Sequence, residues 1–290
     1  MTKVIDKESI NIKNTFKLKD YFLSMEEFEL RKNEKFGFLE TFPQPLENLA
    51  KYYESEDYIS HTDSSKNLSE KIYQFIKNYN IRYKFSKLGK LKSGTKILDY
   101  GCGAGDFLLY AKNKNLDVFG IEPNESALAI TRKKIGQNNA SEKSIQELNE
   151  QFDIITMWHV LEHIPNLFEF IETLKSKLNP GGKIFIAVPN HQSFDAKFYQ
   201  KYWAAYDVPR HLWHFSPNSF HKLFNSFGMK IEKTFPLWFD SYYVSLLSEK
   251  YKKMPFGFLR AAVIGSFSNF IGIFNGNYSS VIYQITKNEN

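Results

Sequence analysis

Short apolar runs alternate with amphipathic stretches between residues 95 and 190. The apolar residues are nearly continuous within each run, as expected for strands covered on both faces of a parallel sheet. The runs lie at 96–100, 117–121, 152–157 and 183–188, and the intervening pattern predicts helices over 106–113, 125–136 and 167–178. Asn179-Pro180-Gly181-Gly182 predicts a turn before the fourth run. This alternation is typical of βαβ units in an α/β fold.

The regions on either side are less regular. Helices are expected at 46–53 and 68–88, and a third that begins at Ser216-Pro217 and stops at Gly228. Two closing strands are expected at 229–235 and 281–286, with a long insertion between them at 237–278. We therefore expect an N-terminal extension over 1–90 and a main domain over 91–290, which carries this insertion and an irregular lid segment over 191–215.

Composition narrows the classes of protein. The 290 residues are 42% hydrophobic with a net charge of +6, and the positive charges are scattered, so a nucleic-acid partner is not favoured. The single cysteine, Cys102, excludes a disulfide within the chain and a multi-cysteine zinc site. No apolar core is present in the first residues, so no signal peptide is expected and a cytoplasmic location is predicted.

A glycine-rich loop joins the first predicted strand to the helix that follows. It reads Asp99-Tyr100-Gly101-Cys102-Gly103-Ala104-Gly105, and the next strand ends at Glu122. Glycines let the backbone pass close to a ligand, a helix start offers N–H groups to an anion, and a carboxylate after the second strand can accept two ribose hydroxyls. The third glycine comes one place earlier than in a dinucleotide fingerprint, so the pattern predicts a different nucleotide-type ligand.

The loop and the motifs after it resemble class I S-adenosylmethionine-dependent methyltransferases over about residues 95–235. The matching pieces include the D-x-G-C-G-x-G pattern at 99–105, Gly120-Ile121-Glu122, and Leu161-Glu162-His163-Ile164. The resemblance implies an α/β, doubly wound, mostly parallel seven-stranded sheet (Rossmann-like) with an antiparallel last strand. A helical N-terminal extension and a helical insertion before the last strand complete the expected fold. S-adenosylmethionine is the implied cofactor.

The resemblance also implies a set of cofactor-binding residues at the carboxyl ends of four strands. They are Asp99, Gly101, Cys102, Gly103 and Gly105 after the first strand, Glu122 and Pro123 after the second, Ser144 and Ile145 after a weak third, and Trp158 and His159 after the fourth. Asp99 and the glycines would hold the methionine end, and Glu122 would hold the ribose.

Two histidine segments are candidates for the chemistry. His159, Glu162 and His163 resemble the E-x-x-E-H segment of ubiquinone-pathway O-methyltransferases, which is associated with a divalent metal. Because His159 replaces the first Glu, a hard Mg²⁺ would lose an oxygen ligand; we predict no metal and place His159 in the reaction cleft, with a transition metal as the alternative. His211 and His214 lie in a stretch that resembles the H-L-x-x-F-S segment of sugar and small-molecule methyltransferases, which implies His211 as a catalytic base.

The N-terminal stretch 27–45 resembles the cysteine knuckle of related bacterial methyltransferases. Asn33 and Phe36 stand where cysteines would, so a zinc site is not expected. The resemblance continues through Tyr58 and His61, which are either cleft or linker residues.

We therefore expect methyl transfer to a small-molecule acceptor at oxygen. The alternatives are sugar C- or N-methylation, RNA methylation and a non-catalytic cofactor-binding protein. The apolar residues of 254–274 recur at helical spacing, which predicts a helix over the acceptor pocket. The alternative is an interfacial helix assisted by Lys250, Lys252 and Lys253, which would put the protein at the inner membrane surface with an apolar or lipid-linked acceptor. The sequence does not indicate an oligomeric state.

Overall fold

The computed structural model describes residues 16–53 and 68–288, which form two compact units. Of the described residues, the sheet unit comprises 68–188, 224–235 and 282–288, and the accessory unit comprises 16–53, 189–223 and 236–281. These units differ from the expected division at residue 90, because the chain returns to the accessory unit after residue 188. The division into an N-terminal extension and a main domain stays a prediction. Tyr58 and His61 lie outside the described residues.

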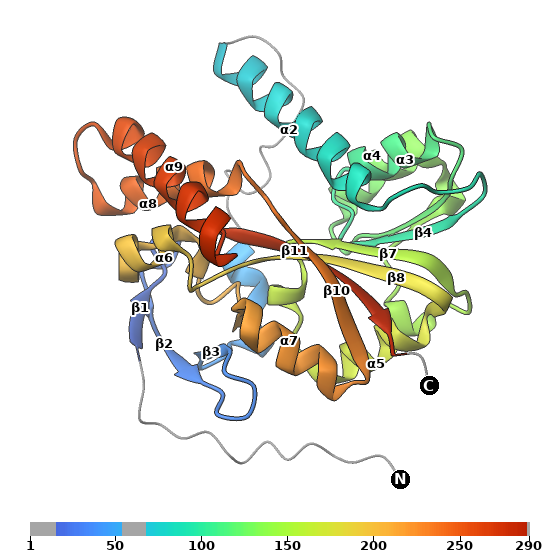
Figure 1. Cartoon of the computed structure of the whole chain (residues 1–290), viewed down its shortest axis with the longest axis horizontal. Coiled ribbons are helices and arrows are strands. Elements are labelled where there is room, and N and C mark those ends of the chain that lie inside the picture. The colour runs from blue at the N-terminus through green and yellow to red at the C-terminus, as the bar shows by residue number, and fades with distance from the viewer. Residues whose placement is uncertain (1–15, 54–67, 289–290) are drawn as a thin grey trace. The chain divides into compact units, whose positions relative to one another are not determined.

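The sheet unit is built on seven strands in the order β10-β11-β8-β7-β4-β5-β6 (Figure 1). The strands are β4 (Lys96–Tyr100), β5 (Asp117–Ile121), β6 (Ala140–Ser141), β7 (Phe152–Trp158), β8 (Leu178–Pro189), β10 (Met229–Pro236) and β11 (Ser280–Lys287). The pairs β4–β5, β4–β7, β5–β6 and β7–β8 are parallel, whereas β11, the last strand, is antiparallel. This is the doubly wound order that the sequence predicted, with the chain crossing to the other half of the sheet between β6 and β7.

Burial explains the continuous apolar runs. Ile97 and Leu98 on β4, Ile155 and Met157 on β7, and Ile184–Ala187 on β8 are all completely or almost completely buried, although neighbouring residues on a strand point to opposite faces. The sheet is therefore covered on both sides. The described helices of this unit are α2 (Leu68–Lys87), α3 (Asp106–Lys112), α4 (Glu125–Ile135) and α5 (Leu167–Ser176), with short 3₁₀ turns η2 (Gln137–Asn139), η3 (Ile145–Glu147) and η4 (Leu161–His163).

One predicted turn is part of a strand instead. Asn179–Gly182 lies within β8, where the pairing with β7 shifts between Phe152 and Ile154. Gly181 has φ +73° and takes the left-handed conformation that the irregularity requires. The Pro-Gly-Gly sequence thus produces a bulge, and β8 begins five residues earlier than its apolar run.

The accessory unit contains a second sheet that the sequence prediction missed. Its strands are β1 (Phe16–Lys19), β2 (Glu27–Lys32), β3 (Leu39–Phe42) and β9 (Trp213–His214), all antiparallel and in that order. Only helices were expected in residues 1–90, and of these η1 (Leu46–Tyr53) is a 3₁₀ helix. The strands are short and rich in Lys and Glu, and β3 pairs with a strand more than 170 residues later, so local pattern could not reveal them.

The β2–β3 turn closes at the two positions where knuckle cysteines were expected to be replaced. The side-chain oxygen of Asn33 accepts a hydrogen bond from the Phe36 backbone N–H at 3.0 Å, and Asn33 also bonds to Glu40 Oε1 at 2.7 Å. Gly37 follows at φ +84°. An asparagine side chain thus holds this turn by hydrogen bonding.

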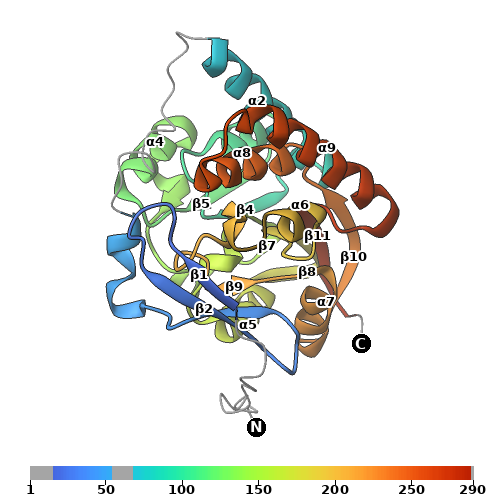
Figure 2. The same ribbon diagram turned by 90° about the vertical axis from the view of Figure 1, so that its left-hand side faces the viewer.

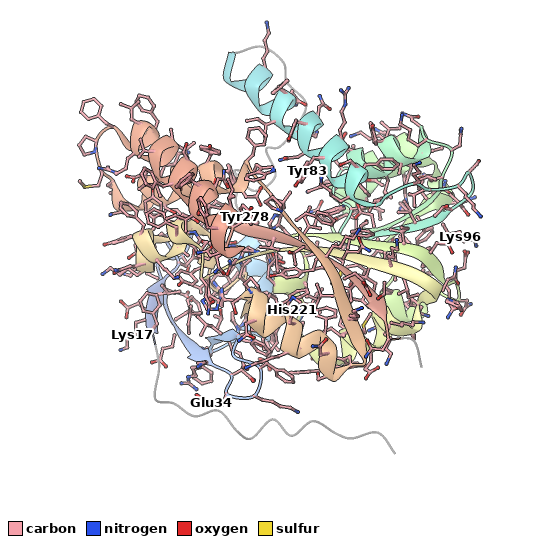
Figure 3. The ribbon with its side chains drawn as sticks, viewed as in Figure 1. Lys17, Glu34, Tyr83, Lys96, His221 and Tyr278 are labelled. Carbon is pink, nitrogen blue, oxygen red and sulfur yellow. The ribbon has the colours of Figure 1, made fainter. Side chains whose placement is uncertain are left out.

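The remaining elements lie after β8. They are α6 (Phe194–Tyr199), η5 (Gln200–Tyr202), η6 (Ala204–Tyr206), α7 (Pro217–Ser226), α8 (Asp240–Lys252) and α9 (Gly257–Asn275). Ser216 caps α7 by accepting the Ser219 N–H at 3.2 Å, as expected. The insertion is helical, as predicted, and α8 and α9 pack side by side (Figures 1 and 2). After α9, the ring of Tyr278 (Figure 3) lies 5.2 Å from that of Trp238.

Candidate functional site

The glycine loop between β4 and α3 is tightly packed. The backbone N–H groups of Gly101 and Cys102 both donate to the Ile121 carbonyl, at 2.8 and 3.0 Å, which ties the loop to the end of β5. Gly101 has φ +74°, and a Cβ at this position would come within 2.5 Å of Val160 Cγ2. A glycine is therefore required both by conformation and by the close approach of the chain after β7.

Glu122 holds the loop from the end of β5. Its Oε2 accepts the Gly103 N–H at 2.8 Å and its Oε1 accepts the Asn124 N–H at 2.9 Å. The carboxylate is only 9% exposed, so its position is fixed by these two bonds. Because each carboxylate oxygen can accept two hydrogen bonds, both oxygens keep a lone pair for a hydroxyl of a ligand. The arrangement fits the predicted ribose contact.

Gly103 and Gly105 differ in their surroundings. A Cβ at Gly105 would lie 2.7 Å from Thr131 Oγ1, whereas a Cβ at Gly103 would meet no protein atom within 4 Å. Thr131 donates to the Gly103 carbonyl at 2.6 Å, which anchors the loop from α4. Gly103 thus borders open space while its backbone is held on both sides, which fits a loop that a ligand approaches closely.

Asp99 is buried at the carboxyl end of β4. Thr156 Oγ1, on its register partner in β7, donates to Asp99 Oδ1 at 2.6 Å. Burial raises the pKa of Asp99 to about 7; the Thr156 hydrogen bond and the charge of Lys84 oppose the rise, and the charge of Glu122 adds to it. A buried carboxylate that is costly to ionise favours a cationic ligand, which would restore its charged form. This fits the amino group of a methionine-like ligand.

Trp158 and His159 follow the end of β7. The Trp158 ring makes an edge contact with Phe107 at 5.2 Å and lies 4.9 Å from the ammonium of Lys84. Its indole N–H is buried, and no group in the described part of the chain accepts a hydrogen bond from it. A ligand acceptor at this N–H would remove the cost of leaving a buried donor unsatisfied. The residue after it, His159, has φ +60°, an uncommon conformation for a non-glycine residue, and is about one third exposed.

The other predicted cofactor residues have more ordinary environments. The Cys102 thiol is buried against Gly120, so only its backbone can serve a ligand, and burial raises the pKa of this thiol well above its usual range. Pro123 is exposed. Ser144 is also exposed and donates to Glu147 at 2.8 Å, whereas Ile145 is completely buried. Their contact with an adenine stays a prediction.

His211 lies in the accessory unit and is almost completely buried. Its Nδ1 is 2.9 Å from the Ala205 carbonyl, which can only accept, so Nδ1 carries a proton. Asp207 Oδ2 lies 3.9 Å from Nε2 and can stabilise the imidazolium that forms when Nε2 takes a proton. The role of His211 as a general base stays a prediction.

His214 has a structural role. It is almost completely buried, and its Nε2 lies 3.0 Å from Thr41 Oγ1, which itself donates to the His211 carbonyl at 2.6 Å. His214 must therefore donate to Thr41, and burial lowers its pKa well below 6.5. His191 is neutral for the same reason, with a pKa lowered to about 4. Neither imidazole is therefore suited to take up a second proton as a base.

Sequence reasoning missed Thr131 and Thr156. Of the two polar residues in β7, Asp153 and Thr156, only Thr156 is buried, and this was the available signal, because a buried hydroxyl needs a partner. That Thr156 pairs with Asp99 could be known only from the register of β4 and β7. Thr131 lies in α4 at a position that carries no special pattern, so only the packing of α4 against the loop shows its function.

Comparisons with known proteins agree with this geometry. Residues 73–234 match the family model described as "Methyltransferase domain". The ubiquinone biosynthesis O-methyltransferases of Acinetobacter baumannii and Pseudomonas fluorescens are 31% and 30% identical over 107 and 106 residues, 34% of this chain in each case. The matches cover 45% and 46% of the two relatives, so this chain spans less than half of their length.

Solved structures share the fold at low identity. A cyclopropane synthase of Mycobacterium tuberculosis superposes with a TM-score of 0.52 at 16% identity, covering 81% of this chain and 88% of that one. Phosphoethanolamine N-methyltransferase 2 of Haemonchus contortus gives 0.51 at 17% identity, covering 87% and 62%. Magnesium protoporphyrin IX methyltransferase of Synechocystis gives 0.50 at 15% identity, covering 82% and 94%. With the family match over more than half of its length, the chain belongs to the methyltransferase-domain family.

Proposed function

We propose that this protein transfers a methyl group from S-adenosylmethionine to the oxygen of a small-molecule acceptor. The observation that carries the proposal is the Glu122 carboxylate, held by the Gly103 and Asn124 N–H groups with a lone pair left on each oxygen. The solved structures of the Haemonchus and Synechocystis enzymes contain S-adenosylmethionine, and the related ubiquinone-pathway enzymes are O-methyltransferases.

The residues of the sheet unit would hold the cofactor by its two polar ends. Glu122 would accept the ribose hydroxyls, and ionised Asp99 would balance the positive charge of the amino acid end. When bound, the cofactor supplies a methyl group on a positively charged sulfur. Displacement at that carbon is accelerated mainly by alignment, so the chain's task is to position the acceptor and to exclude water.

Two histidines have proposed roles in the reaction. We assign His211 as the base that takes the acceptor proton at Nε2, because the Ala205 carbonyl engages its Nδ1. His159, in its left-handed conformation after β7, is assigned to the cleft. A hydroxyl acceptor must lose its proton during transfer, and a base next to the acceptor would take it.

The finer features of the proposal follow from the relatives and from the composition. The named relatives with ubiquinone-pathway activity are bacterial, which supports a bacterial biosynthetic enzyme that works in the cytoplasm. An apolar or lipid-linked acceptor fits the many exposed aromatic side chains of the accessory unit.

The test of the function is the formation of S-adenosylhomocysteine in the presence of a panel of phenol, catechol and sugar acceptors. We expect turnover with at least one hydroxyl acceptor, and His211→Gln should lower it by about 100-fold or more while S-adenosylmethionine still binds. His221→Gln is the matched control, since His221 is a half-buried imidazole on α7 (Figure 3). Full activity of His211→Gln would remove the base assignment, and product methylated only at nitrogen or carbon would overturn O-methylation.

A further inference from the structure

Helix α9 exposes most of its large apolar side chains, and the residues that it buries are mostly small or polar. The buried residues are Ala261, Ile264, Gly265, Ser268, Asn269 and Gly272. Five apolar residues spaced by three or four positions form one exposed stripe, each between 54% and 75% exposed: Leu259, Val263, Phe267, Phe270 and Phe274. We call this stripe the α9 face. In a helix that rests on a protein core and faces water, the arrangement is the opposite.

Hydrogen bonds and close packing hold the helix in this orientation. Ser268 Oγ donates to the buried carboxylate of Asp195 at 2.6 Å, and Asn269 Nδ2 donates to the Trp238 carbonyl at 2.9 Å. A Cβ at Gly265 would lie 2.8 Å from the ring of Tyr242, so α9 packs against α8 too closely for a side chain at this position. Rotation of α9 to bury its aromatic face would break all of these contacts.

Small residues toward the protein and large apolar residues outward is the pattern of helices that face lipid. Among the described helices, α9 is the one that is long and apolar enough to cross a membrane, with a mean hydropathy of 1.4. However, its polar side is bonded to Asp195 and Trp238, so it cannot leave the fold to span a bilayer. A helix of this kind lies in the plane of the membrane interface.

The charges around the α9 face have one sign. Lys250, Lys252 and Lys253 lie at the turn between α8 and α9, with Lys250 and Lys253 exposed. Of the two carboxylates in the hairpin, Glu249 is buried and paired with Arg260 at 2.7 Å, and Asp240 is half-buried at the far end of α8. The hairpin therefore presents lysines without exposed carboxylates, which complements anionic phosphate headgroups.

The apolar surface continues onto α6. The ring of Phe194 lies 6.2 Å from Phe267 and 6.3 Å from Phe198, which is 40% exposed. The ammonium of Lys252 lies 5.5 Å from the Phe198 ring, so the cationic and aromatic groups adjoin each other. An aromatic surface edged by lysines is larger than a chance exposed residue and marks a site of interaction.

We propose that the α9 face docks this protein on a membrane surface rich in anionic phospholipid, with α9 lying flat and its aromatic rings among the acyl chains. A second copy of the chain is a poorer occupant, because its own α9 hairpin would bring no exposed carboxylate to pair with these lysines. The hairpin lies outside the residues that match the methyltransferase-domain family, and the proposal does not depend on the chemistry of the cofactor site.

The experiment is flotation of the full chain with vesicles of phosphatidylcholine alone or mixed with phosphatidylglycerol. Binding to the anionic vesicles should exceed binding to the neutral ones by about tenfold and fall with added salt. The double variant Phe270→Ser/Phe274→Ser should lose about tenfold or more, as should Lys250→Glu/Lys253→Glu. Phe75→Ser is the matched control, since Phe75 on α2 is 68% exposed, and it should bind as the wild type does.

A second measurement does not depend on the serine variants being stable. The natural Cys102 is buried, so Phe267→Cys can be labelled with an environment-sensitive fluorophore, which should shift to shorter wavelength on phosphatidylglycerol vesicles. Absence of wild-type binding to anionic vesicles would overturn the proposal, as would binding that the α9 variants leave unchanged. Self-association without lipid that the same variants abolish would identify a second copy as the occupant and refute the lipid surface. Vesicle binding in a protein that fails to bind S-adenosylmethionine would reject the proposed function alone.

Discussion

The glycines of the cofactor loop are required for different physical reasons. Gly101 and Gly105 have positive φ and face Val160 and Thr131 at distances that exclude a side chain, whereas Gly103 faces open space. The first two are therefore constrained by the fold. Gly103 is constrained by its φ of +54° and by the ligand that we propose to bind next to it. The D-x-G-C-G-x-G pattern thus combines a folding requirement with a binding requirement.

Alanine substitutions should separate these requirements. Gly103→Ala should cost only about 1–2 kcal/mol of stability, the cost of a left-handed alanine, but should lower affinity for S-adenosylmethionine at least about tenfold. Gly101→Ala should cost about 2–5 kcal/mol because it adds a clash with Val160. Urea unfolding and calorimetric binding check both. Wild-type affinity in a folded Gly103→Ala protein would show that no ligand approaches this glycine.

Asp99 gives the cofactor-free protein a pH-dependent stability. Burial raises the pKa of its carboxyl from 3.8 to about 7, so between these values the folded state keeps a proton that the unfolded state has released. The contribution of Asp99 to the free energy of unfolding therefore falls as pH rises from about 4 to 7, and its full destabilising effect is reached above pH 7. Asp99→Asn should be more stable than the wild type at pH 8 by up to about 4 kcal/mol, and equally stable at pH 4. Urea midpoints for the two proteins that differ by the same amount at both pH values would contradict this.

The candidate site was predictable from sequence where chemistry required an unusual residue. Asp99 and Glu122 are acidic residues at the ends of apolar strands, and the glycines lie directly before the start of α3. All of them therefore departed from the local sequence pattern. Thr131 and the orientation of the Cys102 thiol were not predictable, because they depend on which helix face packs against the loop. Tertiary packing decides these features, and no periodicity along the chain records it.

At the scale of elements, Asp195 joins three segments of the accessory unit. Its carboxylate accepts hydrogen bonds from Ser268 on α9 at 2.6 Å, from Ser279 before β11 at 2.7 Å, and from the Trp203 indole at 2.7 Å. The residue itself is completely buried on α6, where a polar side chain is costly unless its atoms are hydrogen-bonded.

Removal of this carboxylate should loosen the accessory unit. Asp195→Ala leaves three buried donors without their acceptor and should cost about 3–5 kcal/mol in urea unfolding. Ser266→Ala, which removes an exposed hydroxyl of the same helix, should cost less than about 1 kcal/mol and serves as the control. Equal stability losses in the two variants would show that Asp195 does not hold these segments together.

Elements with local patterns were predicted better than elements that depend on distant partners. The strands β4, β5 and β7 matched their apolar runs, because a strand buried on both faces is mostly apolar. The strands β1–β3 were missed because each is short and one face carries Lys and Glu, and the sheet is completed by β9 from the distant segment. Residues 179–182 form a bulge instead of the predicted turn. The reason is that β8 pairs with β7 on both sides of this segment, at Leu178 and at Lys183.

At the scale of the whole chain, the family match and the new surface occupy different segments. Residues 73–234 match the methyltransferase domain and include the glycine loop, Glu122 and His211, whereas α8 and α9 follow that match. The proposed cofactor residues therefore lie inside the matched domain, and the α9 face lies outside it. Fold class was therefore predictable from sequence, while the surface required knowledge of which side of α9 is buried.

The central claim is that the sheet unit binds S-adenosylmethionine through Glu122. Calorimetric titration of the full chain with S-adenosylmethionine, and then with S-adenosylhomocysteine, tests it most directly. The wild type should bind both at one site, Glu122→Gln should lose at least about tenfold in affinity, and Glu125→Gln, an exposed acid in the first turn of α4, should bind normally. No heat of binding with the wild type, or equal affinity in Glu122→Gln, would contradict the account.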